Sequence, residues 1–397
     1  MTSRRFKIFN VVGTRPNMMK MAPIMAEMRR LSEAHPVLVH TGQHYDFRMS
    51  QVFLEQLNLG EPDHNLNVGS GSHHGQTAQI LEKFGELVMA ERPDMIVVAG
   101  DVNSTMACAL VGAKELIPVA HVEAGLRSFD RSMPEEINRI VADSISDLLF
   151  TTEQSGTDNL IQEGIPQEKI VFTGNAMIDS LVAALKRARA CSIGQQLGLQ
   201  PGKYILVTLH RPSNVDQAQN LEPALRAIVE IAQHYAIPAI FPVHPRTQAR
   251  IAGLQIAGIE KWDNQSAVKS GNVWLMPPAS YLDFLSLMDR AAIVITDSGG
   301  IQEETTYLGI PCLTYRDNTE RPVTVQHGTN HLVGADPAAL IATAKQVLSR
   351  PKAPHRVPPL WDGRAAERIV ASILSYLRQR SELAAQKAAA VTNVRTQ

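Results

Sequence analysis

Short apolar runs alternate with longer amphipathic segments along most of the chain. In the first half the apolar runs predict strands, and the segments with helical periodicity predict helices. The predicted strands are Phe6–Val12, Val37–Thr41, Met95–Ala99, Val119–Val122 and Leu148–Thr152, and the predicted helices are Met18–Leu31, Thr77–Glu91, Thr105–Glu115 and Pro134–Ser146. Short apolar strands between amphipathic helices indicate a parallel sheet that is covered by helices on both faces. The first half therefore predicts a doubly wound α/β domain.

The second half repeats this alternation after a break. Apolar periodicity lapses between Lys186 and Lys203, which is therefore the expected boundary. Beyond it the predicted strands and helices are Tyr204–Thr208, Leu221–Tyr235, Ala239–Val243, Val273–Met276, Tyr281–Arg290, Ile293–Thr296, Pro311–Thr314 and Pro337–Leu348. We expect two doubly wound domains at residues 1–190 and 203–362, a last helix over 363–383 and a disordered tail over 384–397.

Charged, histidine and glycine residues gather directly after the predicted strands. In open α/β sheets, ligands bind beyond the carboxyl ends of the strands. The segments that follow strands and contain such residues are Gly13-Thr14-Arg15-Pro16 with Lys20, Gly100-Asp101, His121 to Arg127, His210-Arg211, His244-Pro245-Arg246 and Asp297-Ser298-Gly299-Gly300. Each has a simpler interpretation as a helix cap or a surface ion pair. Their coincidence at strand ends favours a functional site.

The turn from Asp297 to Glu304 is the most suggestive of these segments. It follows four β-favouring residues and opens a helical pattern, so free backbone N–H groups at the helix N-terminus would form an anion site. Two adjacent glycines let a ligand approach the backbone closely, and Glu304 could accept hydrogen bonds from sugar hydroxyls. Taken alone, the turn is equally consistent with a capped strand–helix junction.

Composition narrows the class of ligand. The net charge of -1 disfavours a nucleic-acid or anionic-membrane partner, so any phosphate must be held by local groups. Three separated cysteines fit a reduced cytoplasm, and no apolar stretch approaches the length of a membrane span. The sequence lacks GxxxxGK[ST], which excludes a P-loop enzyme. The glycines of residues 69–75 have the wrong spacing for an NAD site and follow no predicted strand.

These features describe an enzyme that handles nucleotide sugars, and the motifs resemble one family. Over about residues 6 to 375 the chain resembles the non-hydrolysing UDP-N-acetylglucosamine 2-epimerases. The motifs that carry the resemblance are Gly13 to Pro16, Gly100-Asp101, His121 to Arg127, Pro134 to Arg139, Thr173-Gly174-Asn175, His210-Arg211, Pro242-Val243-His244, Asp297 to Glu304 and Arg316 to Pro322.

The resemblance implies a glycosyltransferase-B-like fold of two Rossmann-like domains, with the active site in the interdomain cleft and the last helix crossing back to the first domain. It implies reversible interconversion of UDP-GlcNAc and UDP-ManNAc without a redox cofactor or a metal. It also implies a cytoplasmic homodimer that supplies ManNAc-type sugars for surface polysaccharide. The family eliminates UDP to form 2-acetamidoglucal and then adds UDP back.

The same resemblance assigns roles to residues. Acid and base would be among Asp101, Glu123 and Glu135, with their order left open, because the reaction needs two carboxyl groups with separated pKa values. By the same resemblance, the leaving diphosphate would be stabilised by His210, Arg15 and Ser298-Gly299-Gly300, and UDP would be bound by Lys20 and Arg321. Phe284 would pack on the uracil and Glu304 would bind the ribose. Arg139 would orient a carboxylate, and Arg211 would support the site.

Several departures from the family pattern keep alternatives open. Pro212-Ser213-Asn214 follows Arg211 where many members have Arg-Glu-Asn, and the loop between Arg127 and Pro134 is shorter than in some members. Asp46 stands where members that are activated by a second UDP-GlcNAc have glutamine, so we expect no such activation. The open alternatives are an epimerase of UDP-2,3-diacetamido uronic acids, a hydrolysing epimerase, a glycosyltransferase of the same fold and an inactive nucleotide-sugar sensor.

Overall fold

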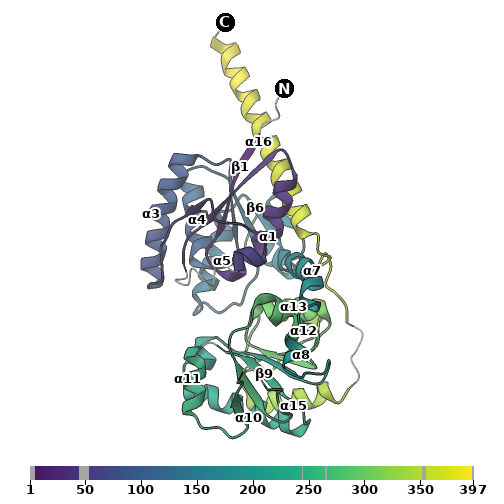
Figure 1. Cartoon of the computed structure of the whole chain (residues 1–397). Helices are drawn as coiled ribbons and strands as arrows, with labels where there is room; N and C mark the ends of the chain where they lie inside the picture. Colours follow the sequence, from purple (N-terminus) through teal and green to yellow (C-terminus); the bar gives the residue numbers. More distant parts are fainter. Residues whose placement is uncertain (1–4, 44–52, 244, 264–265, 351–354, 396–397) are drawn as a thin grey trace. The chain divides into compact units, whose positions relative to one another are not determined.

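Two seven-stranded sheets organise the chain (Figure 1). The computed structural model describes residues 5–43, 53–243, 245–263, 266–350 and 355–395. The chain divides into unit 1, which comprises Met1–Ser180 and Pro359–Gln397, and unit 2, which comprises Leu181–Pro358. Across the described residues every strand pairing in both sheets is parallel, as the alternation of strands and helices predicts.

The sheet of unit 1 has the strand order β3-β2-β1-β4-β5-β6-β7. Its strands are β1 (Phe6–Val12), β2 (Ala34–His40), β3 (His64–Asn65), β4 (Met95–Ala99), β5 (Val119–Ala124), β6 (Leu148–Thr151) and β7 (Ile170–Phe172). The direction of winding reverses between β1 and β4, and a sheet of this kind binds ligands at such a switch point. Asp101 comes directly after β4, so it lies at the expected position.

Helices cover both faces of this sheet. They are α1 (Arg15–Arg30), α3 (His73–Glu91), α4 (Asn103–Lys114), α5 (Pro134–Ile145), α6 (Gln154–Gln162), the 3-10 turn η1 (Gln167–Lys169) and α16 (Ala365–Arg395). Helix α7 (Ala176–Arg189) begins in unit 1, and from Leu181 onward it belongs to unit 2. Helices α3, α4 and α5 lie side by side, and α1 packs with α16 (Figure 1). The interior under α3 and α4 is apolar, with Phe9, Phe84, Ile96 and Val98 fully buried. This burial supplies the main driving force for folding of the unit.

Unit 2 has a second doubly wound sheet, in the order β10-β11-β9-β8-β12-β13-β14. Its strands are β8 (Ile205–Thr208), β9 (Ala239–Pro242), β10 (Ile259–Lys261), β11 (Val273–Met276), β12 (Ile293–Thr296), β13 (Cys312–Thr314) and β14 (Asn330–Leu332). Its helices are α8 (Ile193–Gln196), α9 (Pro212–Val215), α10 (Ala218–His234), α11 (Pro245–Gly253), α12 (Tyr281–Asp289), α13 (Gly299–Leu308), α14 (Pro322–Gln326) and α15 (Pro337–Leu348). The switch point lies between β8 and β12, the strands that precede His210 and Asp297.

The periodic pattern of the sequence predicts most of the long elements and the short strand β13, but it misses the 14-residue helix α7 and several short elements. The strands Phe6–Val12 and Met95–Ala99 have the predicted bounds. Helix α1 begins three residues before its predicted start because Pro16 is accepted in a first helical turn. Helix α16 continues to Arg395, past the predicted end at residue 383, where the chain is rich in alanine, the strongest helix former. The short elements β3, α6, β7 and β10 lie outside the predicted set.

A buried carboxylate joins α7 to the start of α16. Asp179 accepts hydrogen bonds from the backbone N–H groups of Ala365, at 3.1 Å, and Ala366, at 2.7 Å. These are two of the donors that a helix N-terminus leaves without partners inside the helix. Nearby, the Trp361 indole donates to the carbonyl of Thr152 at 2.9 Å. The two contacts hold the C-terminal segment within unit 1.

We expect Asp179 to make the stability of the protein depend on acid pH. Burial raises the pKa of Asp179 to about 6, although the two N–H donors oppose the rise. The folded state therefore holds an extra proton between about pH 4 and pH 6, and stability falls as pH rises through that range. Asp179→Asn should remove this slope, so the free energy of unfolding of the variant relative to wild type should rise by about 2 kcal/mol from pH 4 to pH 7. Parallel stability curves in denaturant titrations would contradict this.

Candidate active site

Glu123 is held in an unusual backbone conformation at the carboxyl end of β5. The pairing of β5 with β6 shifts register between Val122 and Ala124, so Glu123 is the extra residue of a bulge, and its φ is +69°. A non-glycine residue adopts this left-handed conformation only when its surroundings enforce it. Bulges of this type redirect a side chain, and they are frequent beside active sites.

The Glu123 carboxylate forms an ion pair with Lys20 of α1. The Lys20 ammonium donates to Glu123 Oε1 at 2.6 Å, and the two side chains are only 4% and 3% exposed. Gly100 provides the space for this pair, because a Cβ at its position would lie 2.8 Å from Lys20 Nζ. Its φ of +67° also favours glycine. Lys20 was expected to contact UDP, and the structure places its ammonium on a candidate catalytic carboxylate.

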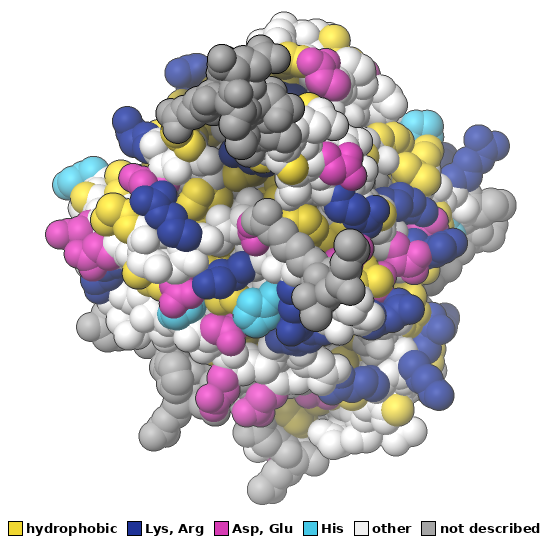
Figure 2. All heavy atoms as spheres, turned by 90° about the horizontal axis from the view of Figure 1, so that it is seen from above, with side chains coloured by type: hydrophobic (Ala, Val, Ile, Leu, Met, Phe, Trp, Pro, Cys, Tyr) yellow, Lys and Arg dark blue, Asp and Glu magenta, His cyan; other side chains and the backbone are white. Residues whose placement is uncertain are grey.

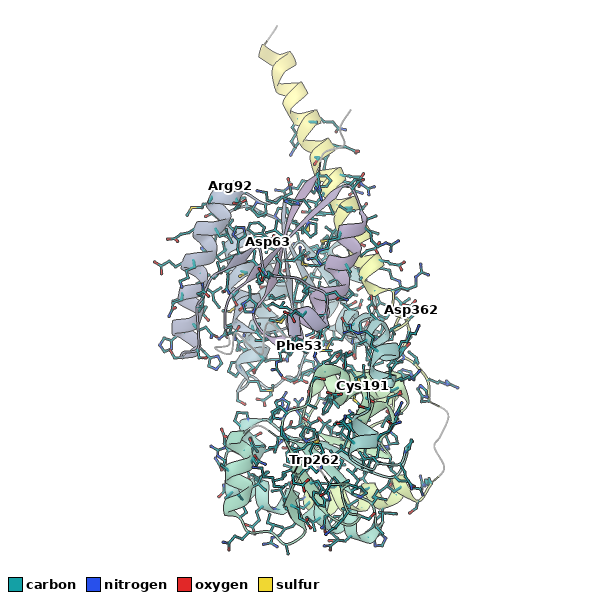
Figure 3. All side chains as sticks on the ribbon, viewed as in Figure 1. Phe53, Asp63, Arg92, Cys191, Trp262 and Asp362 are labelled. Carbon is teal, nitrogen blue, oxygen red and sulfur yellow. The ribbon has the colours of Figure 1, made fainter. Side chains whose placement is uncertain are left out.

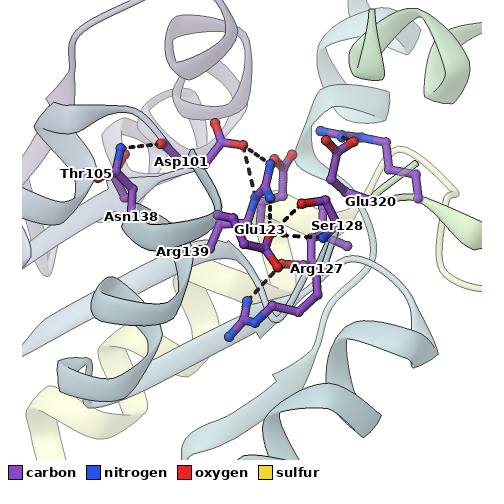
Figure 4. Close-up of polar contacts among 12 residues, drawn as sticks. Asp101, Thr105, Glu123, Arg127, Ser128, Asn138, Arg139 and Glu320 are labelled. Atoms are coloured by element: carbon purple, nitrogen blue, oxygen red, sulfur yellow. Dashed lines mark hydrogen bonds and ion pairs between the residues drawn. The ribbon is translucent and has the colours of Figure 1, made fainter. Parts of the chain in front are cut away.

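Asp101 is oriented by an arginine from α5. Arg139 donates to Asp101 Oδ2 from Nη2 at 2.6 Å and from Nε at 3.1 Å, as Figure 4 shows. The other side of the guanidinium binds Glu136 Oε2 at 2.6 Å. The predicted role of Arg139 as the partner of a carboxylate therefore has a geometric basis. Glu135, the residue before Glu136, is half-buried in the first turn of α5.

A buried polar network lies behind these carboxylates. His121 contacts Asp143 Oδ1 at 2.7 Å and the carbonyl of Gly100 at 2.7 Å, and Arg127 contacts Asp143 Oδ2 at 2.7 Å. Burial alone would raise the pKa of Asp143, but His121 and Arg127 reverse the effect and hold it below its ordinary value. Asp143 also accepts from the Gly125 N–H at 3.1 Å. The network fixes the two turns that carry Asp101 and Glu123.

In unit 2 the N-terminus of α13 and a buried arginine bring positive charge together. Helix α13 begins at Gly299 after Ser298, which makes no side-chain cap hydrogen bond, so the N–H groups of the first turn remain outside the helical ladder. A Cβ at Gly299 would lie 2.5 Å from Arg321 Nη1. The guanidinium is tied to Glu303 at 2.8 Å and to Glu320 at 3.3 Å. A helix N-terminus beside a fixed arginine suits a phosphate group.

His210 is supported by a buried aspartate. Asp297 Oδ1 lies 3.1 Å from His210 Nδ1, and the carboxylate also accepts from the N–H of Arg211 at 2.9 Å and from Asn214 at 3.0 Å. Burial would raise the pKa of Asp297, but the hydrogen bonds from His210 and its neighbours hold it below its ordinary value. The His210 imidazole is 61% exposed, so its other face is open to a ligand.

Glu304 is buried on α13 and contacts α12. The Tyr281 hydroxyl donates to Glu304 Oε1 at 3.2 Å. Burial raises the pKa of Glu304 to about 8, with the charge of Glu303 adding to the rise and the Tyr281 hydrogen bond opposing it. Glu304 therefore carries a proton near neutral pH. Phe284, predicted to pack on a base, is half-buried one turn after Tyr281 on α12.

The remaining predicted residues have simpler surroundings. The Arg15 guanidinium at the start of α1 lies 5.6 Å from the centroid of the Phe53 ring, which is labelled in Figure 3. Arg211 donates from Nε to the carbonyl of Asp297 at 3.1 Å. His244 and Asp46, which the motifs single out, lie outside the described residues.

The mixture of charges on the surface indicates that a ligand is bound by individual residues and not by a large surface of one charge. Figure 2 shows basic and acidic side chains mixed over the face that it presents, in keeping with the net charge of -1. Among the residues that the structure describes, none of the helices combines the length and apolar character needed to cross a membrane. The same part of the chain holds no group of three or more His, Cys, Asp or Glu side chains arranged to bind a metal ion.

Comparison with known proteins decides the family. The model of the UDP-N-acetylglucosamine 2-epimerase family matches residues 26–374. The chain belongs to this family. A UDP-N-acetylglucosamine 2-epimerase of Methanococcus maripaludis is 40% identical over 369 residues, which are 92% of this chain and 97% of that protein.

The names of two further relatives of this epimerase state a ligand or a substrate. A crystal structure of the Methanocaldococcus jannaschii UDP-GlcNAc 2-epimerase in complex with UDP-GlcNAc and UDP has a TM-score of 0.83 and 40% identity, and it covers 93% of this chain and 99% of that chain. The UDP-2,3-diacetamido-2,3-dideoxy-D-glucuronate 2-epimerase of Pseudomonas aeruginosa is 39% identical over 349 residues, which are 87% of this chain and 93% of that protein. The predicted glycosyltransferase-B-like fold is confirmed.

The motifs do not predict which buried residues bind the site residues of this epimerase. The motifs assign no role to four buried carboxylates that bind a candidate residue or the turn beside one. These are Glu136, Asp143, Asp297 and Glu303. A signal exists for the first two. Glu136, Arg139 and Asp143 lie on one face of α5, at the spacing that normally carries apolar residues into a core.

Proposed function

We propose that this chain reversibly interconverts UDP-GlcNAc and UDP-ManNAc, without hydrolysis and without a redox cofactor or metal, in a cytoplasmic homodimer that serves surface-polysaccharide synthesis. The observation that carries the proposal is Glu123, a strained and buried carboxylate at the end of β5, the strand next to β4, which Asp101 follows. A family that inverts a carbon next to the anomeric centre needs carboxyl groups fixed in this way.

The chemistry follows from the weak acidity of the C2 proton. Because C2 is not adjacent to a carbonyl, removal of its proton alone has too high a barrier. A carboxylate takes the proton while the C2–H electron pair forms the C1=C2 double bond and the C1–O bond breaks, releasing UDP and 2-acetamidoglucal. A second carboxyl group then gives a proton to the opposite face of C2 as UDP adds back to C1. Asp101, Glu123 and Glu135 are the candidates for these two roles.

Unit 2 supplies the groups that suit the leaving diphosphate. As the C1–O bond breaks, negative charge grows on the phosphate, and donors already fixed in place stabilise it with little reorganisation. The candidate donors are the N-terminus of α13, Arg321, which is fixed by Glu303, and His210, which contacts Asp297. Arg15 and Lys20 of unit 1 are further cationic candidates. We assign binding of the uracil and ribose to Phe284 and Glu304.

A product analysis tests the proposed function. Incubation with UDP-GlcNAc should yield UDP-ManNAc by NMR, and incubation with UDP-ManNAc should yield the same final mixture. Free ManNAc with UDP would identify a hydrolysing enzyme instead. Turnover of a UDP-2,3-diacetamido uronic acid with none of UDP-GlcNAc would assign the activity that the Pseudomonas aeruginosa relative is named for.

If the Glu304 carboxylate accepts hydrogen bonds from ribose, UDP binding should release a proton. The pKa of about 8 keeps Glu304 protonated at pH 7, and ribose donors favour the ionised form, so binding lowers that pKa. UDP affinity should therefore increase as pH rises from 6 to 8. Calorimetry in buffers of different ionisation heat should detect close to one more released proton for wild type than for Glu304→Gln, a comparison that cancels the titration of UDP itself. Equal proton release would rule out this role.

A further inference from the structure

The loop after β5 presents an aromatic side chain in a strained conformation. Phe129 has a φ of +58°, which a bulky residue rarely adopts, and its side chain is 77% exposed. Burial would normally be favourable for a ring of this size. The loop that contains it joins Arg127 to α5.

A buried carboxylate holds this conformation in place. Glu136, which is 1% exposed, accepts the Phe129 N–H on Oε1 at 2.9 Å and the Ser128 N–H on Oε2 at 3.0 Å. The Ser128 hydroxyl donates to the same Oε2 atom at 3.0 Å. Asp130 and Ser132 close the rest of the turn by a hydrogen bond of 2.6 Å between their side chains. The loop is therefore built to keep the backbone at Phe129 fixed.

The same carboxylate links Phe129 to a candidate catalytic residue. Glu136 Oε2 binds Arg139 at 2.6 Å, and Arg139 binds Asp101 at 2.6 Å (Figure 4). Glu136 thus binds both the loop and the cation that orients Asp101, and its Oε2 atom accepts hydrogen bonds from Ser128 and from Arg139. The position of Phe129 is coupled to Asp101 through a series of charge-assisted hydrogen bonds of 2.6 to 2.9 Å, of which the one between Glu136 and Arg139 is buried.

Leu116 shows that strain and exposure alone do not mark a site. It has a φ of +58° and is 81% exposed, which matches Phe129 closely. It precedes β5, whereas Phe129 follows it, so the two residues lie at opposite ends of the same strand. Only the carboxyl end carries ligands in a sheet of this type. Leu116 is therefore a matched control.

We infer that Phe129 is a substrate-contacting residue that packs its ring on the sugar of the nucleotide sugar. This inference rests on the proposed function, which places a pyranose beside Asp101 and Glu123. The C–H groups of a pyranose and the methyl group of an acetamido substituent offer apolar surface to an aromatic ring. A ring in that position also excludes water from C2, where a carboxyl group exchanges a proton. Phe129 thereby contributes to recognition of the sugar and not of UDP.

The test compares affinities for UDP-GlcNAc and UDP in Phe129→Gly, Phe129→Tyr and Leu116→Gly. Glycine tolerates the positive φ, so the first variant removes the ring without straining the backbone. We expect Phe129→Gly to weaken UDP-GlcNAc binding about 10-fold relative to UDP binding, and to lower kcat/KM by at least as much. Leu116→Gly should keep the wild-type ratio of affinities and the wild-type kcat/KM within about twofold. Phe129→Tyr, which keeps an aromatic ring, should recover most of the preference for UDP-GlcNAc over UDP that Phe129→Gly loses.

Three results would overturn the inference. An unchanged ratio of affinities in Phe129→Gly would show that the ring does not contact the sugar. Equal weakening of UDP and UDP-GlcNAc would place it on the nucleotide or assign it a purely structural role. A change in oligomeric state by sedimentation would make it a subunit contact. Failure of the proposed function has a separate readout, because it would appear as absence of UDP-GlcNAc turnover in the wild-type enzyme.

Discussion

Glu123→Gln should lower the epimerisation rate on the order of 100-fold or more. The amide keeps the size of the side chain but can neither take up nor deliver a proton at C2. Glu123 is the candidate with the strongest structural basis, because a bulge with φ of +69° and a buried ion pair with Lys20 fix its carboxylate. Rates are measured by NMR under saturating UDP-GlcNAc, and UDP affinity and the melting temperature are measured on the same protein.

Two control variants separate catalysis from folding. Removing the charge of Glu123 leaves the buried Lys20 ammonium facing a neutral group, which is destabilising in itself. The double variant Lys20→Met/Glu123→Gln removes both charges, and it should remain inactive. Glu163→Gln removes a carboxylate that binds Arg127 at 2.7 Å, and it should keep the rate within about threefold of wild type. Restoration of activity in the double variant would show that Glu123 serves only as a structural partner.

Gly299→Ala should weaken UDP binding by about 10- to 100-fold. The added Cβ would lie 2.5 Å from Arg321 Nη1 and 2.8 Å from its Cζ, so the guanidinium must move. Its contacts with Glu303 and Glu320 restrict that movement. The methyl group also occupies the first turn of α13, where a phosphate would approach the backbone. Alanine is a better helix former than glycine, so the fold should be retained.

A second glycine of unit 2 provides the matched control. A Cβ added at Gly194 in α8 would meet no neighbouring group within 4 Å, so Gly194→Ala adds the same methyl group in open space. It should bind UDP like wild type in calorimetry. If Gly299→Ala also binds UDP within about twofold of wild type, the N-terminus of α13 is not the diphosphate site.

The long apolar strands and amphipathic helices were predictable because each carries its own periodic signal. Strands such as Met95–Ala99 are buried on both faces and appear as uninterrupted apolar runs. The short strands β3 and β7 show no period in the sequence, and they exist because longer neighbours provide an edge for pairing. The extent of α16 depends on alanine content, whereas the small and polar residues of that segment predict a frayed tail.

In the candidate site, too, some features were predictable from the sequence and others were not. The location of Asp101, Glu123 and His210 after strands follows from the general rule for α/β sheets. Their partners do not, because side chains far apart in sequence meet only in the folded state: Lys20 and Glu123 are separated by 103 positions, and His210 and Asp297 by 87. The positive φ of Glu123 and Phe129 also has no sequence signal, since neither residue type favours it.

Solvent exchange at C2 tests the central claim most directly. The wild-type enzyme is incubated with UDP-GlcNAc in D2O, and C2 is followed by NMR and mass spectrometry. Elimination and re-addition with proton delivery by a carboxyl group predict deuterium at C2 in both UDP-GlcNAc and UDP-ManNAc, at a rate matching epimerisation. UDP-ManNAc that forms with its original C2 hydrogen retained would contradict the account.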